Sequence, residues 1–243
     1  MLQTLRQPRW IILTVFVVVV AAVFIRLGIW QLDRLEERRE LNAEVSARLE
    51  SEPVSLEDLL EEAAGDFDSI QYRRVLVDGV FDADEEVLIR SQVELGQAGF
   101  HVITPLTSTT SVLINRGWVP LTMDQPPVDA LPPVGETEVV GWVHLTEERP
   151  TLGREDPAGD VDVLNRVDVE RIGEQLPYPV VPVYVVAMGE SDRLPVLVDL
   201  PDVEDEGPHL AYAIQWFGFA TVGLVGFYFL VRARGGKGSV REG

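Results

Sequence analysis

Two long apolar segments, one near each end of the chain, dominate its pattern of hydrophobic and polar positions. The first has no charge from residue 11 to 25 and continues past Arg26 to Leu32. The second, residues 210–231, contains 22 uncharged residues. As helices rising about 1.5 Å per residue, both are long enough to cross roughly 30 Å of hydrocarbon. We therefore predict transmembrane helices over residues 10–32 and 209–231.

The first segment also has features of a secretory signal peptide. Arg6 and Arg9 precede an apolar run that passes through a pair of small residues, Ala21 and Ala22. A retained membrane anchor is the favoured interpretation. Trp10 and Trp30 would then lie at the bilayer boundaries as interfacial anchors.

Charges beside the two segments predict the orientation of the chain. Cationic residues both precede the first segment and follow the second, whereas an acidic run stands directly before the second. That run comprises Asp202, Glu204, Asp205 and Glu206. Because cationic flanks stay on the cytoplasmic side, we predict cytoplasmic tails over residues 1–9 and 232–243. Residues 33–208 would form an extracytoplasmic domain of a multi-pass plasma-membrane protein.

The middle of the chain changes from helical to strand-like periodicity. Residues 33–49 keep a helical spacing of apolar positions and are expected to extend the first helix into water. Ser55 and Asp58 form a capping pattern for a short helix that ends before Gly65. A further short helix is expected over residues 168–176.

Beyond Asp68, short β-branched runs bounded by Gly, Pro or Asp indicate strands. The expected strands are residues 72–81, 86–92, 100–106, 112–119, 138–145 and 180–188. A proline-rich loop, residues 125–135, separates the fourth strand from the fifth. Short strands joined by turns are typical of an antiparallel barrel or sandwich. The predicted fold class is therefore α+β, with two transmembrane helices flanking a mainly antiparallel β domain.

Composition excludes several functions. The chain has no Cys, which excludes disulfides and thiolate metal sites, and only three His residues. The formal charge is −20, and residues 26–208 contain 14 Arg against 39 acidic residues, a net charge of −25. Nucleic acid is therefore not an expected partner. A well-solvated surface is the simpler interpretation of this acidity, and recruitment of a basic partner is the alternative.

Catalytic motifs are missing from the sequence, so we predict that the protein is not an enzyme. Two acidic runs, residues 84–86 and 202–206, offer carboxylates to a hard cation. They lack the glycine spacing of a calcium loop, so exposed acidic loops are the favoured interpretation.

Motifs spread along the chain together resemble one known family. They are Leu27-Gly-Ile-Trp-Gln-Leu32 with Arg34 and Arg38-Arg39, Tyr72-Arg-Arg74 with Gly79 and Phe81, Gly99 with Thr104-Pro105-Leu106, Asn115-Arg-Gly-Trp-Val-Pro120, and Gly207-Pro-His-Leu-Ala-Tyr-Ala-Ile-Gln-Trp-Phe217. Their order resembles the Surfeit locus protein 1 family, assembly factors for haem–copper cytochrome c oxidase. Residues 152–203 match that pattern poorly.

The resemblance implies a protein that helps to deliver haem a to, or stabilise it in, the catalytic subunit of the oxidase. It also implies oxidase assembly intermediates and haem a synthase as partners, and a histidine ligand at the start of the second helix, here His209. Independently, neutral imidazole is a common axial ligand of haem iron. A capping or interfacial histidine is the alternative interpretation.

Aromatic and cationic residues near His209 complete the predicted cofactor site. Tyr212 and Trp216 can pack against a porphyrin, and Arg34 or Arg26 can pair with its propionates. Trp30 is assigned to the same site, although simple membrane anchoring is an equal interpretation. Gln31 is expected to bond across to the second helix, near Gln215 or Tyr212. His101 and His144 lie in strand patterns and are interpreted as surface or core residues.

A haem-free scaffold is the alternative function. Ala220, Gly223 and Gly226 form a strip of small residues on which another helix can pack closely. Such a scaffold would hold an oxidase intermediate through helix contacts. Packing of the strip on the protein's own first helix is the simpler interpretation.

Overall fold

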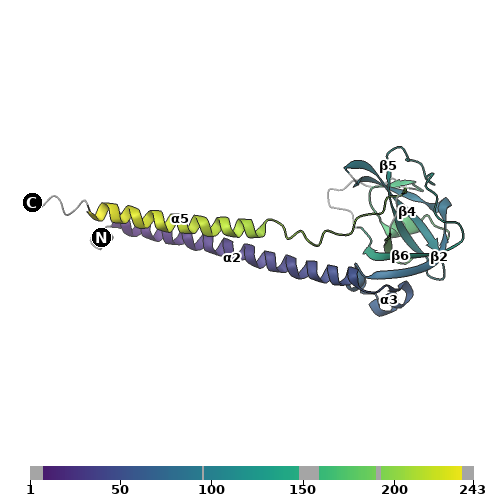
Figure 1. Ribbon diagram of the computed structural model, residues 1–243, viewed down its shortest axis with the longest axis horizontal. Helices are drawn as coiled ribbons and strands as arrows, with labels where there is room; N and C mark the ends of the chain where they lie inside the picture. The colour runs from purple at the N-terminus through teal and green to yellow at the C-terminus, as the bar shows by residue number, and fades with distance from the viewer. Residues whose placement is uncertain (1–7, 95, 148–158, 190–192, 237–243) are drawn as a thin grey trace, which may run out of the picture. The chain divides into compact units, whose positions relative to one another are not determined.

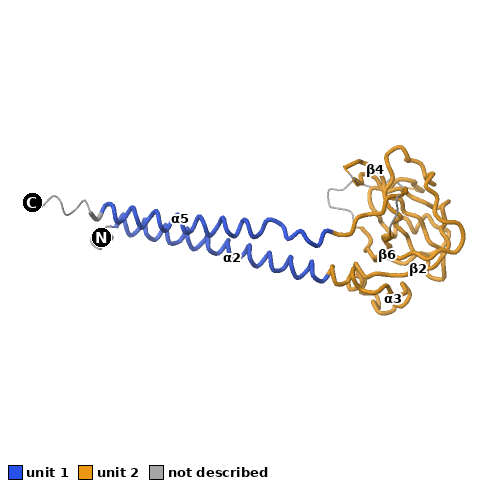
Figure 2. Tube along the Cα trace, in the orientation of Figure 1, with its two compact units in different colours: residues 1–44, 202–243 blue, residues 45–201 orange. Residues whose placement is uncertain are grey.

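The chain forms two compact units in a computed structural model that describes residues 8–94, 96–147, 159–189 and 193–236 (Figure 1). One unit combines residues 1–44 with residues 202–243, and the other comprises residues 45–201 (Figure 2). Segments from the two ends of the sequence therefore build one unit, and the middle of the sequence builds the other.

Two long helices make up most of the first unit. Helix α2 (Pro8–Glu50) is continuous over 43 residues, and helix α5 (His209–Gly236) follows much later in the chain. Each contains a stretch long and apolar enough to span a membrane. The apolar segment and the amphipathic segment after it thus belong to a single helix, as the sequence predicts.

The second unit is built around eight strands with short helices between them. The strands are β1 (Val54–Ser55), β2 (Arg74–Phe81), β3 (Val87–Glu94), β4 (Gln97–Thr107), β5 (Val112–Pro120), β6 (Glu136–Leu145), β7 (Val163–Leu164) and β8 (Val183–Ala187). The helices are α3 (Leu56–Ala63), η1 (Phe67–Ile70), η2 (Ala83–Glu85) and α4 (Val169–Gly173). Ser55 caps α3 by accepting a hydrogen bond from the Glu57 N–H, as the capping pattern predicts.

The strands pair in a closed ring, which makes a small barrel. Strand β2 pairs with β6, β6 with β8, β8 with β5, β5 with β4, and β4 pairs again with β2. The sheet is mixed, because β1–β2, β5–β8 and β3–β7 run parallel. The longer pairings, β2–β6, β3–β4, β4–β5 and β6–β8, are antiparallel, so the predicted domain is mainly but not purely antiparallel. A tight turn forces neighbouring strands to be antiparallel, whereas the long excursion between β6 and β8 lets β8 run parallel to β5.

Two apolar clusters fill the domain. The larger cluster lies among β2, β4, β5, β6 and β8 and includes Leu56 and Leu59 of α3. The smaller cluster contains Leu88, Phe100, Val102, Val119 and Val128. Val128 comes from the proline-rich loop, so this loop contributes to the core.

A buried ion pair links the strands to the proline-rich loop. Arg116 is 7% exposed, and its guanidinium lies 3.0 Å from the Glu86 carboxylate, which is fully buried. The hydroxyl of Thr104 donates to Glu86 and accepts from Arg116 Nε. Thr104 lies between Val102 and Leu106 on the same face of β4, so the pair sits between the two apolar clusters.

The remaining hydrogen bonds of this pair go to the loop backbone. The Val128 N–H donates to Glu86 at 2.8 Å, and Arg116 donates to the Ala130 carbonyl at 2.8 and 3.0 Å. Burial lowers the pKa of Arg116, and the charge of Glu86 opposes that shift. Glu86 is therefore neither part of an exposed acidic loop, the favoured interpretation of its sequence, nor free to bind a cation.

A β-bulge aims Arg116 at this position. Val102 pairs with Gly117 and Ile103 with Asn115, so Arg116 is the extra residue on β5. Gly117 has φ +125°, and a Cβ there would collide with the Val196 carbonyl. The motif Asn115-Arg-Gly thus requires glycine both for its backbone conformation and for close packing.

His101 is a half-buried neutral residue in the same region. Its Nδ1 accepts from the Asn115 amide at 3.3 Å, and its Nε2 lies 3.6 Å from a Glu94 carboxylate oxygen. Burial lowers the pKa of His101 to about 4. Burial, followed by the charge of Asp199, raises the pKa of Glu94.

Replacing Arg116 alone should destabilise the domain strongly. Arg116→Ala leaves the Glu86 charge buried without a partner, which costs about 3–5 kcal/mol of the free energy of unfolding. Replacing both residues, as Arg116→Met with Glu86→Leu, should cost less, because no unpaired charge remains. Urea unfolding of the full chain in detergent measures both values. Equal costs for the single and double variants would contradict this assignment.

Acidification should destabilise the domain through His101. Because its folded pKa lies below the ordinary 6.5, the unfolded chain binds the proton more tightly. Stability should therefore fall by up to about 3 kcal/mol as the pH drops from 6.5 to 4. The raised pKa of Glu94 acts in the opposite sense and reduces the net loss.

The control for this pH dependence is His101→Gln, whose carbonyl can still accept from Asn115. Its stability, measured by denaturant titration at pH 7 and pH 4.5, should fall less on acidification than that of the native chain. An identical loss in both proteins would contradict the role given to His101.

Candidate functional site

Helices α2 and α5 pack against each other along one face of α2. Residues of α2 that are buried or bonded in this unit are spaced alternately by three and four. They are Ala21, Phe24, Gly28, Gln31, Leu35, Arg38 and Asn42. This spacing keeps one face of the helix turned toward its partner, as in a coiled coil.

The closest approach occurs at Gly28. A Cβ on Gly28 would lie 2.7 Å from two ring carbons of Phe217, so only glycine admits this aromatic side chain. One turn away, Phe24 stacks on Trp216 with ring centroids 5.6 Å apart. Close packing at a small residue is a general way in which apolar helices associate.

His209 is hydrogen-bonded to α2 near the contact between Gly28 and Phe217. Its Nδ1 lies 2.8 Å from the side-chain carbonyl oxygen of Gln31. Because a carbonyl oxygen can only accept, Nδ1 carries the proton and donates. In the neutral imidazole, Nε2 then carries the lone pair, and it has no hydrogen-bond partner among the described residues. Metal-binding histidines commonly show this arrangement, in which the second ring nitrogen donates to a fixed oxygen.

The segment before His209 leaves space at this nitrogen. A Cβ on Gly207 would lie 3.5 Å from His209 Nε2 and 3.4 Å from Cδ2. A larger residue at position 207 would extend into the space beside Nε2.

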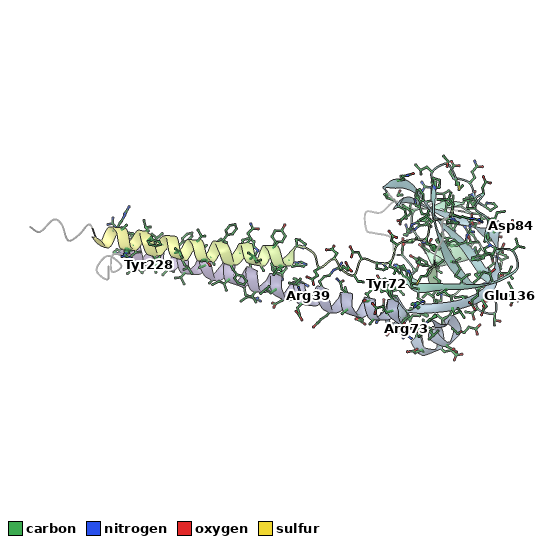
Figure 3. The ribbon with its side chains drawn as sticks, viewed as in Figure 1. Arg39, Tyr72, Arg73, Asp84, Glu136 and Tyr228 are labelled. Atoms are coloured by element: carbon green, nitrogen blue, oxygen red, sulfur yellow. The ribbon has the colours of Figure 1, made fainter. Side chains whose placement is uncertain are left out.

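The same segment is clamped to α2 by polar contacts. Arg39 donates two hydrogen bonds to the Glu206 carboxylate, at 2.7 and 2.9 Å, and Figure 3 labels Arg39 on α2. Arg38 and Asn42 both donate to the Asp205 carbonyl. The hydrogen bonds between Arg39 and Glu206 raise the pKa of the first and lower that of the second. The clamp fixes where α5 begins.

Three of the four side chains of the acidic run before α5 are already engaged. Asp202 Oδ1 accepts from the backbone N–H groups of Glu204 and Asp205, and Asp205 Oδ1 accepts from Gly207 N–H. Glu206 pairs with Arg39. These oxygens shape the turn, so the run shows no set of carboxylates held ready for a cation. Among the described residues, no group of three or more acidic or histidine side chains could hold a metal ion.

Not all of the residues assigned to the site by sequence come together. Trp216 packs on Phe24, and Tyr212 follows His209 on α5 with its side chain exposed. Trp30 and Arg34 fall between the contact positions of α2. There the Arg34 guanidinium lies over the Trp30 ring and bonds to Glu37. Among the described residues, no hydrogen bond or ring contact joins Trp30 or Arg34 to His209, so their assignment to the site stays a prediction.

The sequence also predicts roles for Gln31 and Trp10 of α2. Gln31 does bond across to the second helix, but its partner is His209 rather than Gln215 or Tyr212. Trp10 is buried beneath the Arg234 guanidinium.

The residues of the predicted small-residue strip differ in their surroundings. Ala220 is buried, whereas a Cβ on Gly223 or Gly226 would meet no atom within 4 Å. Packing on the protein's own first helix, the simpler interpretation, therefore holds for Ala220 alone.

In the second unit, an aromatic row lies outside the barrel. Tyr72 stacks on Trp142, and His144 lies against Trp142 and Tyr184. Tyr72 has φ +66° and is held by its N–H to the Val143 carbonyl. His144 Nδ1 donates to the Leu145 carbonyl at 2.9 Å.

A hollow of about 840 Å³ opens beside α4 in the same unit. Its lining is partly acidic and partly apolar: Thr146, Glu147, Asp168, Val169, Glu170, Gly173, Glu174, Pro179, Val180 and Pro182. Glu147 and Asp168 already accept hydrogen bonds there, from Tyr184 and from the Arg171 N–H. The hollow shows no constellation of catalytic groups.

Comparisons with known proteins bear on the helix contact. A sequence model of the SURF1 family matches residues 18–221, most of the chain. The chain belongs to the SURF1 family. A SURF1-like protein of Monosiga brevicollis is 28% identical over 91% of this chain and 88% of its own length. An uncharacterised SURF1-like protein of Mycobacterium tuberculosis is 26% identical over 95% of this chain and 88% of its own. Surfeit locus protein 1 of Arabidopsis thaliana is 32% identical over 47% of this chain and 35% of its own.

Two of the motifs that carry the resemblance to the SURF1 family, the first and the last, meet at the helix contact. Gly28 and Gln31 come from the first motif, and His209, Trp216 and Phe217 come from the last. Sequence reasoning missed the roles of Phe24, Gly28, Phe217 and the Arg39 clamp. The alternating spacing of three and four along α2 is the signal that could have revealed them.

Substitution of Gly28 should separate the two helices. Gly28→Ala places a methyl group 2.7 Å from the Phe217 ring, so the ring or the helix must move. Because the native chain lacks Cys, spin labels at Val18→Cys and Val222→Cys report the distance between the helices. The distance distribution should broaden or lengthen in Gly28→Ala.

The matched control is Gly223→Ala, a helix glycine whose added methyl group meets no atom within 4 Å. This variant should leave the distance distribution unchanged. If both variants behave alike, Gly28 does not govern the contact.

Proposed function

We propose that this protein is a membrane-bound assembly factor for haem–copper cytochrome c oxidase that binds haem a through His209. The observation that carries this proposal is the hydrogen bond from His209 Nδ1 to Gln31, which leaves Nε2 as a free electron-pair donor. Membership of the SURF1 family agrees with a general role in oxidase assembly. Nothing among the described contacts indicates catalysis.

The donor chemistry at the start of α5 fits a haem ligand. Neutral imidazole is an ordinary axial ligand of haem iron, and a fixed acceptor on the second ring nitrogen strengthens such a ligand. The position that a Cβ on Gly207 would take lies 3.5 Å from Nε2 and is empty. Haem supplies the iron atom that accepts the Nε2 lone pair.

Each neighbouring residue has a separate task in this proposal. Gln31 fixes the tautomer and the ring orientation of His209. The clamp made by Arg39 and Glu206 holds the segment that carries His209 against α2. Tyr212, exposed one turn later, offers an aromatic face to the macrocycle. Trp216 acts indirectly, because its ring packs against Phe24.

The proposed setting is a plasma membrane crossed by α2 and α5. Both helices have apolar stretches of sufficient length, and cationic residues lie beyond the N-terminal end of one and the C-terminal end of the other. With both tails in the cytoplasm, His209 is placed at the outer boundary of the bilayer. The proposed partners are the oxidase catalytic subunit, its assembly intermediates and haem a synthase.

A haem-free scaffold is the second candidate function. Gly223 and Gly226 present open backbone on α5, against which another apolar helix can pack. This function needs no imidazole ligand. An absorption spectrum of the purified protein separates the two functions.

Haem binding is tested with the full chain purified in detergent from cells that make haem a. We expect a Soret band in the native protein and its loss or a strong shift in His209→Ala. The variant should remain folded, because loss of a residue at a helix boundary costs only about 1 kcal/mol. Gln31→Ala should weaken binding while keeping the ligand, because His209 loses its fixed orientation.

His144→Ala is the matched control, because that imidazole also donates through Nδ1 to an oxygen. Its spectrum should be the same as that of the native protein. A native chain without a Soret band would favour the scaffold. An unaltered spectrum in His209→Ala would remove this site.

A further inference from the structure

The loop between β5 and β6, residues 121–135, combines an anchored first half with an exposed apolar second half. Val128 is 2% exposed and packs in the smaller apolar cluster. The next residues emerge from the domain: Leu131 is 66% exposed and Val134 is fully exposed. Pro132 between them is buried.

The anchor of this loop is unusually strong for a connection on a protein surface. Glu86 accepts from the Val128 N–H, and Arg116 donates twice to the Ala130 carbonyl. A buried ion pair gives little net stability, because desolvation offsets most of its attraction. What this pair provides here is a fixed backbone, with Ala130 directly before Leu131.

The exposed arm is itself stiff. Pro132 and Pro133 each fix their φ angle near −65°, and Pro133 restricts the residue before it. Consecutive prolines favour the polyproline II conformation, which aromatic-lined grooves of proteins recognise at a small entropic cost. A rigid arm that holds Leu131 and Val134 in water has no purpose for stability, since burying them would be favourable.

The charge and composition of the loop select among possible occupants. Residues 121–135 contain Asp124 and Asp129 but no Lys, Arg, Trp, Tyr or Phe. Loops that enter a bilayer surface carry the cationic and aromatic residues that this loop lacks. An anionic membrane would also repel a domain of this acidity. A protein surface fits the loop better than a lipid surface does.

We propose that residues 131–134 dock into an apolar, aromatic-lined groove of a partner protein, with Leu131 and Val134 as the inserted side chains. This function goes beyond haem binding and does not depend on it. The ion pair between Arg116 and Glu86 holds the arm in its binding conformation, which reduces the ordering cost of association.

The test uses the full chain in its native membrane, with the photo-crosslinking residue p-benzoylphenylalanine at position 134. Position 93 is the control, because Val93 is 63% exposed in the same domain but belongs to β3. Light should yield one protein product from position 134, whose linked peptide maps to an aromatic-lined surface. Position 93 should not yield that product.

A second substitution tests whether apolar insertion drives the contact. Leu131→Ser should lower the yield from position 134 about tenfold, since loss of one buried leucine weakens binding by about that factor. Val93→Ser should leave the yield unchanged. Products with lipid alone or with a second copy of this chain would overturn the proposal, as would equal products from both positions or a yield insensitive to Leu131→Ser.

Discussion

The close approach of two apolar helices at Gly28 is the constraint on which the proposed site depends. Between apolar surfaces in a bilayer there is no water to expel, so helices associate through close packing and hydrogen bonds. The Phe217 ring occupies the position that a side chain at residue 28 would fill. One turn along α2, the spacing that brings Gly28 to α5 also brings Gln31 to His209. The close packing required at Gly28 thereby helps to orient an imidazole that does not itself touch Gly28.

The β domain solves a related problem by a different means. There a bulge, made possible by Gly117, turns Arg116 into the interior, where Glu86 and Thr104 satisfy it. In both units, glycine at a point of close approach lets a polar group be held where chain geometry alone would not put it. The difference lies in what is held. Between the helices it is a nitrogen with a free lone pair, and in the domain it is the backbone of a surface loop whose apolar arm remains in water.

Much of the fold could be predicted from the sequence, because periodicity reports directly on burial. The predicted strands and the continuous first helix overlap their observed counterparts closely. The parallel pairing of β8 with β5 could not be predicted, since nothing local to residues 183–187 specifies the direction in which a long connection returns. At the site, His209 could be singled out as a candidate ligand from its residue type and position in the sequence. Its hydrogen-bond partner could not, because Gln31 and Gln215 carry the same amide and differ only in their angular positions around their helices. That angle follows from the three-four spacing on α2, a pattern that a uniformly apolar segment conceals.

That spacing also explains why residues of such different character share one face of α2. Where α5 lies opposite, the contact positions are small or aromatic. Beyond Leu35, α2 contacts the non-helical segment that precedes His209. The backbone carbonyls of this segment have no hydrogen-bond partners within a helix. The next two contact positions on α2 are Arg38 and Asn42, which donate to this segment. A helix makes its own backbone hydrogen bonds and needs only close packing from its neighbour. An irregular segment also needs hydrogen-bond donors for its backbone carbonyls. The change from apolar to polar contacts therefore marks the point at which the second helix must begin. It places His209, the first residue of α5, at the boundary between the two kinds of partner.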